Sequence, residues 1–256
     1  MDQLLRDKVV LVVGGTTGLG AGIARAATRE GASVVVTGRR RERGEALAAE
    51  LGEGVSFVAG DQSDPADARR VVEETVARHG RVDCLVNAAG LTTRGTLLDT
   101  TPELFDEHVA VNLRGPFFTM QAAVADMTRR GAAGTIVNVI TMSAHGGQPY
   151  LAPYVASKAG LIGLTKNAAH AHRFDRVRIN GLNIGWTQTE GEDETQRRFH
   201  DADDGWVERA AAGLPMGKLG QVDEIADAVV FLLSERSGVV TGSVIDWDQS
   251  VVGAHD

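Results

Sequence analysis

The sequence predicts a single α/β domain built on a doubly wound parallel sheet of about seven strands, with helices on both faces. Two observations lead to this fold class. Continuous apolar runs, such as KVVLVVGG at residues 8–15, alternate along the chain with segments of helical periodicity, an order that favours a parallel sheet with right-handed crossovers. The length of 256 residues and the hydrophobic content of 43% suit one large domain, which we expect to span residues 1–256.

The strands are assigned where β-branched residues run together up to a glycine, because strands buried on both faces read as continuous apolar runs. The helices are assigned where apolar residues recur at helical spacing, with Gly31 ending the first and Pro65 near the first turn of the third. The expected strands are 8–13, 32–38, 54–60, 82–90, 134–141, 176–185 and 242–247, and the expected helical segments are 20–31, 42–51, 65–80, 102–130, 154–173 and 222–235.

One segment interrupts this alternation. Residues 186–215 are polar and acidic, and they follow the end of the sixth expected strand. Functional loops in α/β folds gather at the carboxyl ends of the strands. We therefore expect residues 186–215 to form a substrate lid or insertion within the domain.

The composition argues against several classes of protein. A net charge of −8 and a pI near 5.4 oppose binding to nucleic acid or anionic membranes, although GRRRER at residues 38–43 is a small basic cluster. The sequence has no long apolar run and no signal-peptide order at its N-terminus, so we expect a cytoplasmic protein without a membrane span. No Cys/His metal spacing occurs, and we expect no metal. The single cysteine, Cys84, is expected to be a buried core residue.

A glycine-rich turn follows the first expected strand. Gly14, Gly18 and Gly20 lie where the chain turns into a helix. Glycine lets backbone N–H groups and a helix N-terminus approach a bound pyrophosphate. In this strand-to-helix context the turn predicts a dinucleotide site.

The end of the second strand indicates which dinucleotide. Gly38, Arg39 and Arg40 stand where a protein that prefers NAD(H) should place an acid for the ribose hydroxyls. Room and positive charge there favour the 2′-phosphate of NADP(H). The two arginines could instead begin a solvated basic helix face, and NAD(H) remains the alternative cofactor.

Tyr154 and Lys158 are spaced i and i+4, so on a helix they project from one face. A nearby cation favours phenolate and lowers the pKa of a tyrosine, which suits acid/base catalysis. The same pattern also fits a helix start with a packed tyrosine and a surface lysine. The surrounding motifs must decide between the two.

These motifs, in this order, resemble the short-chain dehydrogenase/reductase family over nearly the whole chain. Gly14, Gly18 and Gly20 fill the family's glycine pattern, although Val13 stands where the family usually has threonine, and NAAG at residues 87–90 matches the motif after the fourth strand. The resemblance implies a single-domain Rossmann fold and an NAD(P)-dependent reaction at a CH–OH group. It also implies a homotetramer assembled partly through helices near 101–130 and 154–173.

The resemblance further implies which residues bind the cofactor. Asp61 resembles the acid that meets the adenine amino group, although alone it reads as a helix cap or turn residue. Thr189 holds the position that commonly touches the carboxamide, after Ile184-Gly185 in place of the usual Pro-Gly. The expected cofactor set is Gly14, Thr16, Thr17, Gly18, Leu19, Gly20, Arg39, Arg40, Asp61, Gln62, Asn87, Ala88, Ala89, Gly90, Tyr154, Lys158, Gly185, Thr187 and Thr189.

The implied catalytic residues are Asn112, Thr141, Tyr154 and Lys158. Tyr154 would be the acid/base, Lys158 would hold the nicotinamide ribose and lower the tyrosine pKa, and Asn112 would support a water that connects Lys158 to solvent. Asn112 alone also reads as a helix kink or cap. The family serine falls at Thr141, whose hydroxyl could bind the substrate oxygen, while Ser143 could replace it if a loop shifts the register.

Several residues flank the expected substrate pocket. Ser143, His145, Gln148, Tyr150 and Trp186 are polar or aromatic, which would suit a hydroxylated or ring substrate. Each could also be a packing or loop residue.

The leading hypothesis is an oxidoreductase that transfers a hydride between NADP(H) and a secondary alcohol or ketone, on a polyol, sugar-like or other cyclic metabolite. Val13, Thr141 and Ile184 support an alternative, a dinucleotide-binding regulatory or scaffold protein with weak catalysis. A nucleotide-sugar epimerase or dehydratase would need a larger C-terminal domain than this length allows.

Overall fold

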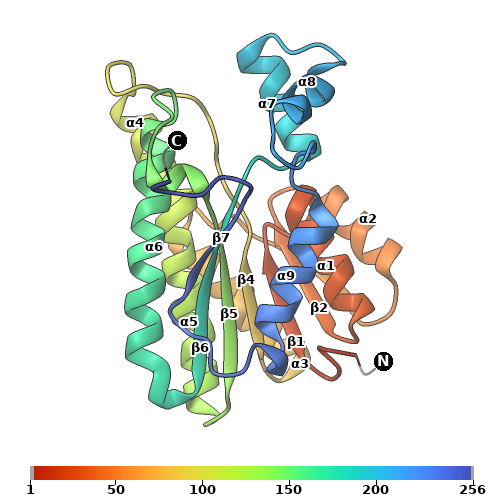
Figure 1. Cartoon of the computed structure of the whole chain (residues 1–256). Coiled ribbons are helices and arrows are strands. Elements are labelled where there is room, and N and C mark those ends of the chain that lie inside the picture. The colour runs from red at the N-terminus through yellow and green to blue at the C-terminus, as the bar shows by residue number, and fades with distance from the viewer. Residues whose placement is uncertain (1–2, 255–256) are drawn as a thin grey trace.

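The computed structural model describes residues 3–254 and confirms the predicted fold class. Within them, seven parallel strands form one sheet in the order β3-β2-β1-β4-β5-β6-β7, with helices on both faces (Figure 1). The strands are β1 (Val9–Val13), β2 (Ser33–Gly38), β3 (Val55–Ala59), β4 (Cys84–Asn87), β5 (Gly134–Thr141), β6 (Val177–Ile184) and β7 (Val244–Trp247).

The helices fall into two layers. Helices α1, α2 and α9 contact one another or the strands on one side, and α3, α5 and α6 pack on the other, with α4 beside α6. Their bounds are α1 (Gly18–Arg29), α2 (Arg41–Leu51), α3 (Pro65–His79), α4 (Pro102–Val109), α5 (Gly115–Arg129), α6 (Ala152–His172), α7 (Glu190–His200), α8 (Trp206–Ala212) and α9 (Val222–Leu233). Short 3-10 turns lie at Met142–His145, Arg173–Asp175 and Glu235–Ser237.

The central strands read as continuous apolar runs because each face of the sheet has its own core. In β1, Val10 and Val12 join the cluster under α1 and α9, whereas Leu11 and Val13 join the cluster under α3 and α5. Alternate side chains of a strand point to opposite faces, so a strand covered on both sides must be apolar at every position.

Several expected helix boundaries differ from the structure by one or two residues, and one expected helix is divided. The segment expected as one helix over 102–130 is α4 and α5 joined by a π-helical turn at Ala110–Arg114. Helix α6 starts at Ala152, two residues before the expected start, because Pro153 fits the first turn of a helix, where its missing N–H costs nothing.

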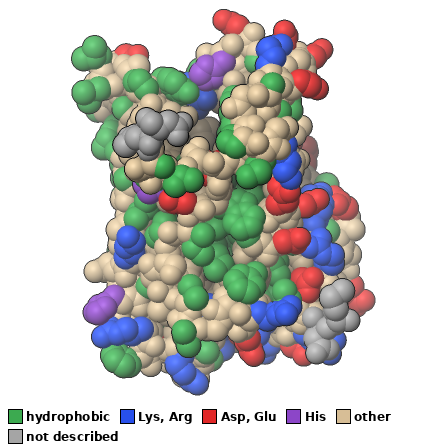
Figure 2. Space-filling view, in the orientation of Figure 1, with side chains coloured by type: hydrophobic (Ala, Val, Ile, Leu, Met, Phe, Trp, Pro, Cys, Tyr) green, Lys and Arg blue, Asp and Glu red, His purple; other side chains and the backbone are tan. Residues whose placement is uncertain are grey.

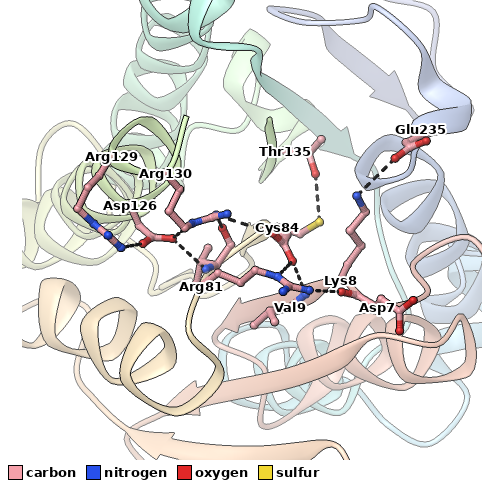
Figure 3. Close-up of polar contacts among 12 residues, drawn as sticks. Asp7, Lys8, Val9, Arg81, Cys84, Asp126, Arg129, Arg130, Thr135 and Glu235 are labelled. Atoms are coloured by element: carbon pink, nitrogen blue, oxygen red, sulfur yellow. Dashed lines mark hydrogen bonds and ion pairs between the residues drawn. The ribbon is translucent and has the colours of Figure 1, made fainter. Parts of the chain in front are cut away.

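The amino ends of β1, β4 and β5 are joined by polar contacts (Figure 3). Asp126 of α5 accepts a hydrogen bond from Val82 N at 3.1 Å and pairs with Arg130, which in turn donates to Val82 O at 2.7 Å. Asp83 accepts from Val9 N at 2.9 Å, so the starts of β1 and β4 are linked. These contacts tie together the amino ends of the strands, opposite their carboxyl ends.

Cys84 is buried at the start of β4, as expected. The Thr135 hydroxyl donates to its sulfur at 3.2 Å, and burial raises the pKa of the thiol to about 11. A thiol so rarely ionised has no role as a nucleophile at neutral pH.

The acidic segment 186–215 folds into α7 and α8, which stand beyond the carboxyl ends of the central strands (Figure 1). Trp186 stacks on Trp206 at 5.9 Å between ring centroids, and their indole N–H groups donate to Glu192 and Asp193 at 2.7 Å each. The segment is therefore an ordered helical pair held by its own acidic residues. No helix between residues 3 and 254 has the length and apolar character needed to cross a bilayer.

Candidate active site

A cavity of about 390 Å³ opens at the carboxyl ends of β1 to β4. β1 lies between β2 and β4, so the chain order reverses there, which is where open α/β sheets bind ligands. Most of the expected cofactor residues line this cavity: Gly14, Thr16, Thr17, Leu19, Gly20, Arg39, Arg40, Asp61, Gln62, Ala88, Ala89 and Gly90.

At Gly14 and Gly20 the glycine turn has no room for a side chain. Gly14 has φ +78°, and a Cβ there would lie 2.4 Å from the backbone nitrogen of Ala89. A Cβ on Gly20 would lie 2.1 Å from the carbonyl oxygen of Gly14. The turn brings the start of α1 to the cavity, and no side chain caps that N-terminus. Uncapped N–H groups at a helix start favour a bound anion.

Two buried polar atoms among the described residues of the cavity lining also lack hydrogen-bond partners, Thr37 Oγ1 and Gln62 Oε1. The narrow turn, the free helix N-terminus and these atoms fit a bound dinucleotide.

The two arginines after β2 reach the same cavity. Arg40 Nη2 donates to Thr17 Oγ1 at 3.0 Å, so its charge lies against the glycine turn, where the sequence itself has no basic residue. A Cβ on Gly38 would lie 3.0 Å from the Thr16 side chain. The end of β2 therefore carries two cations and little space for an acidic side chain.

Two expected cofactor residues, Asn87 and Asp61, make hydrogen bonds that stabilise the structure around the cavity. Asn87 is buried, donates to Asn138 Oδ1 at 2.8 Å and accepts from the Thr119 hydroxyl at 2.7 Å, so its amide joins the sheet to α5. Asp61 lines the cavity and also accepts from the Ser63 N–H at 2.9 Å, which makes it a turn residue as well.

Tyr154 and Lys158 lie on one face of α6, as their spacing predicts. Lys158 is buried, with 4% of its surface exposed, and its Nζ donates to Val139 O at 2.9 Å. Its Nζ lies 6.0 Å from the centroid of the Tyr154 ring. Burial lowers the pKa of Lys158 to about 8.

The tyrosine pKa shifts opposite to the sequence-based expectation. Burial raises the pKa of Tyr154 to about 12, while hydrogen bonding from Thr141 acts to lower it. Lys158 does not counter this shift in the structure, because its ammonium points to the Val139 carbonyl on β5. Desolvation of a phenolate outweighs a cation that is not in contact.

Asn112 lies in the π-helical turn between α4 and α5 and is fully buried. Its amide oxygen accepts from Leu91 N at 2.8 Å, and its nitrogen donates to Leu91 O at 3.0 Å and Ser157 Oγ at 3.1 Å. The kink thus ties the loop after β4 to α6. A Cβ on Gly90 would lie 3.7 Å from Asn112 Oδ1 and 3.8 Å from Lys158 Nζ, so both side chains approach the same glycine.

Thr141 and Ser143 take different positions. Thr141 ends β5, is buried and faces the phenol of Tyr154, to which it contributes a hydrogen bond. The Ser143 hydroxyl instead donates to Gln148 Oε1 on the surface. Of the two hydroxyls, that of Thr141 therefore acts on Tyr154.

The other expected substrate residues fall into two groups. Tyr150 lies edge-on to His200 of α7 at 5.4 Å between ring centroids, whereas Trp186 stacks on Trp206 within the segment 186–215. His145 lies away from them, 3.1 Å from Asp246 of β7 and 3.3 Å from the Asn183 amide.

The segment after β6 runs close to the glycine turn. A Cβ on Gly185 would lie 1.9 Å from Asp248 Oδ1, so a larger residue there would have to displace the exposed side chain of Asp248. Thr187 bonds back to Gly185 O at 2.9 Å, and Thr189 caps α7 by accepting from Glu192 N at 3.0 Å. The nearest side chain to a Cβ on Gly18 is Thr189, at 3.8 Å.

Comparison with known proteins places this geometry in a family. A family model described as Enoyl-(Acyl carrier protein) reductase matches residues 13–250. A solved structure described as a short chain dehydrogenase/reductase family protein is 38% identical, with a TM-score of 0.84 and coverage of 96% of this chain and 98% of its own. The chain belongs to the short-chain dehydrogenase/reductase family.

Two curated members of the dehydrogenase/reductase family are similar along nearly their whole lengths. An A-factor type γ-butyrolactone 1′-reductase (1S-forming) from Streptomyces virginiae is 36% identical and covers 94% of both chains. An L-rhamnose 1-dehydrogenase (NAD(P)(+)) from Azotobacter vinelandii is 34% identical and covers 94% of this chain and 95% of its own. This dehydrogenase/reductase is an NAD(P)-dependent oxidoreductase that acts on CH–OH or C=O groups.

The structure adds residues that the sequence did not single out in this dehydrogenase/reductase. Glu107 of α4 and Val111 of the π-helical turn line the cavity. Arg94 and Glu192 exert charge on Tyr154 from the loop after β4 and from α7. The sequence gives little signal for Arg94 and Glu192, because charged residues are common in a polar loop and in an acidic helix.

Proposed function

We propose that the protein transfers a hydride between NADP(H) and a secondary alcohol or ketone on a polyol, sugar-like or other cyclic metabolite. The observation that carries the proposal is that the Thr141 hydroxyl acts on the phenol of Tyr154, while Lys158, on the same helix face, approaches Gly90 of the cavity lining. Two hydroxyl groups that converge can bind one carbonyl or carbinol oxygen.

Each residue has a distinct task in this proposal. The bound nicotinamide supplies or accepts the hydride. Tyr154 donates a proton to the substrate oxygen during reduction and takes it back during oxidation. Thr141 orients that oxygen. Lys158 contributes a hydrogen-bond donor and, when protonated, a positive charge that favours the phenolate form of Tyr154.

The preference for NADP(H) is supported by the end of β2. Arg39 and Arg40 line the cavity, and the Thr16 side chain closely approaches Gly38, where an acid for the ribose hydroxyls would otherwise be expected. Guanidinium groups bind phosphate through paired, charge-assisted hydrogen bonds.

The substrate class is supported by the lid and by the relatives. The aromatic side chains of Tyr150 and Trp186 and the polar Gln148 present surfaces suited to a hydroxylated ring. One relative is named for a lactone and another for a sugar.

The proposal also includes a cytoplasmic location and a homotetramer. Exposed phenylalanines support association: Phe105 and Phe117 lie on α4 and α5, within the region where the family resemblance implies contacts. Figure 2 shows a further gathering of hydrophobic side chains on the face that carries β7 and α9, where Phe231, Ile245 and Trp247 are exposed.

The first test follows nicotinamide absorbance with purified protein, both cofactors, and a panel of ketones and secondary alcohols that includes sugars, cyclitols, lactones and acyl thioesters. Tyr154→Phe should retain cofactor affinity and lose at least about 100-fold in kcat, because general acid/base catalysis is worth that much or more. Undiminished turnover by Tyr154→Phe would assign the proton to another group. Tight cofactor binding without turnover of any substrate would favour a binding protein.

A further inference from the structure

Arg94, in the loop between β4 and α4, has a charge without an acidic partner. Between residues 3 and 254, no carboxylate lies within ion-pair distance of its guanidinium. Its contacts are a hydrogen bond from Nη1 to Thr92 O at 2.9 Å and two to His200 Nε2, at 3.3 Å from Nε and 3.1 Å from Nη2. A half-buried arginine with only neutral acceptors is uncommon, because the free energy lost with its hydration is usually offset by hydrogen bonds to a carboxylate or phosphate.

The position of Arg94 is fixed by its neighbour in the chain. Gly95 forms an isolated parallel bridge with Leu151, receiving a hydrogen bond from Ala152 N at 3.0 Å and donating to Tyr150 O at 2.9 Å. This bridge pins the loop to the residues that open α6, the helix that carries Tyr154. The backbone next to Arg94 is therefore tied to the start of the helix that carries Tyr154.

Two aromatic rings, one in the segment before α6 and one in α7, lie close to the guanidinium. Its carbon lies 5.3 Å from the centroid of Tyr150 and 5.8 Å from that of Phe199. Because an arginine can only donate, His200 Nε2 is the acceptor in both of these hydrogen bonds. Residues from the loop, the start of α6 and the lid thus converge on one cation.

The charge of Arg94 acts at the reaction centre. It lowers the pKa of Tyr154, although by less than burial raises it. The charge of Glu192 acts on Tyr154 in the opposite direction and raises its pKa. Glu192 forms no ion pair with Arg94. Its carboxylate instead accepts hydrogen bonds from Trp186 Nε1 at 2.7 Å and Gln196 Nε2 at 2.8 Å.

The guanidinium retains donors for a ligand. It has five N–H groups, of which three make the hydrogen bonds to Thr92 and His200. Two remain, and a planar carboxylate is the partner that a guanidinium fork matches best.

We propose that Arg94 binds a carboxylate of the substrate, so that the substrate is a hydroxy acid or keto acid whose carboxylate is separate from the reacting carbinol or carbonyl. This inference rests on the proposed oxidoreductase function and narrows its substrate class to acids. Arg94 selects and orients the substrate, whereas Tyr154 carries the proton.

A binding experiment tests the inference without requiring turnover. The protein saturated with NADP⁺ is titrated calorimetrically with cyclohexanecarboxylate and with cyclohexanecarboxamide, which have the same ring and differ in charge. We expect the carboxylate to bind at least about 10-fold more tightly, as a charge-assisted hydrogen-bonded pair implies. Arg94→Gln should remove this preference and leave the affinity for NADP⁺ unchanged.

Arg198→Gln is the matched control. Arg198 also lies over the Phe199 ring, at 4.9 Å, but projects from the exposed surface of the lid helix. It should keep the wild-type preference for the carboxylate. Equal affinity of the wild type for both probes, or binding of neither, would overturn the inference, as would retention of the preference in Arg94→Gln.

Turnover separates this inference from the proposed function. With NADPH, 3-oxocyclohexanecarboxylate should be reduced with a higher kcat/KM than its carboxamide, and Arg94→Gln should raise KM for the acid about 10- to 100-fold with little change for the amide. Tyr154-dependent reduction of both compounds at equal kcat/KM would leave the oxidoreductase function standing and exclude the carboxylate site. Preferential binding of the acid without reduction of either compound would support the site and count against the reaction.

Discussion

Tyr154 and Lys158 respond in opposite senses to the same burial. The low-polarity environment favours the neutral form of each, so the pKa of the phenol rises to about 12 while that of the ammonium falls to about 8. The two pKa values therefore move apart, from ordinary values of 10.0 and 10.5 to about 12 and about 8. Between these two values both groups are neutral, so the phenol keeps its proton while Lys158 has lost its own.

The lysine pKa makes a prediction about stability. Lys158 binds a proton in the unfolded chain up to its usual pKa of 10.5 but in the folded protein only up to about 8. The unfolded state thus holds more protons between pH 8 and 10.5, and the free energy of unfolding should rise with pH across that window. Relative to Lys158→Met, the wild type should gain about 1 kcal/mol per pH unit between pH 8 and 10.

Denaturant unfolding of the cofactor-free protein at several pH values measures this difference. Lys166→Met is the control, because Lys166 is exposed on the same helix and loses little hydration on folding. Parallel pH profiles for the wild type and Lys158→Met would show that Lys158 keeps its proton in the folded protein.

A second prediction at the level of single residues concerns Arg39 and the preference for NADPH over NADH. Arg39→Asp should weaken NADPH binding at least about 10-fold more than NADH binding, because an acid repels the 2′-phosphate and accepts from ribose hydroxyls. Fluorescence titration with both nucleotides gives the two dissociation constants. Arg41→Asp makes the same charge change on exposed α2 and should affect both nucleotides little. Equal losses for NADPH and NADH in Arg39→Asp would count against the phosphate contact.

At the scale of elements, the turn between β1 and α1 depends on glycine for two separate reasons. Gly14 combines a φ of +78° with a close backbone neighbour, whereas Gly52, at the end of α2, has φ +79° and nothing within 4 Å of a Cβ. Gly14→Ala and Gly52→Ala should both lose about 1 kcal/mol of stability to the backbone conformation. Only Gly14→Ala should also lose NADPH affinity, because it displaces the Ala89 backbone.

Thermal unfolding and nucleotide titration of the two variants separate these effects. If Gly52→Ala lost NADPH affinity to the same extent, the steric explanation for the turn would fail.

The elements were largely predictable because their signals are local. The uniform apolar character of β1 identifies a strand covered on both faces, and Pro65 marks the start of α3. The i, i+4 spacing of Tyr154 and Lys158 predicted their shared face. A helix kink at Asn112 was one alternative from the sequence, but the sequence could not select it, because the hydrogen bonds of Asn112 are to Leu91 and Ser157, distant residues in the chain.

The polar surroundings of the site escaped prediction for a related reason. Arg94, Tyr150 and His200 meet only after three separate segments have folded against one another. The direction of the Tyr154 pKa shift likewise depends on how much solvent the folded chain excludes, which spacing along a helix does not report.

At the scale of the whole molecule, exposed aromatic residues predict association. Sedimentation equilibrium should give the mass of four chains, and Phe117→Asp should lower it by placing a charge in a contact made through α5. Leu97→Asp, in an exposed loop outside that helix, should leave the mass unchanged. A wild-type monomer at working concentration would remove the tetramer from the proposal.

The polar contacts that join Asp126, Asp83 and their partners lie at the amino ends of the strands, on the edge opposite the cavity and lid. The chain can therefore exchange, lengthen or shorten the loops at its reactive edge without disturbing the contacts that hold the sheet in register. Descendants of such a chain can diverge in substrate while inheriting the same framework, and laboratory libraries aimed at new substrates should confine their diversity to the loop of Arg94, the segment before α6 and the lid.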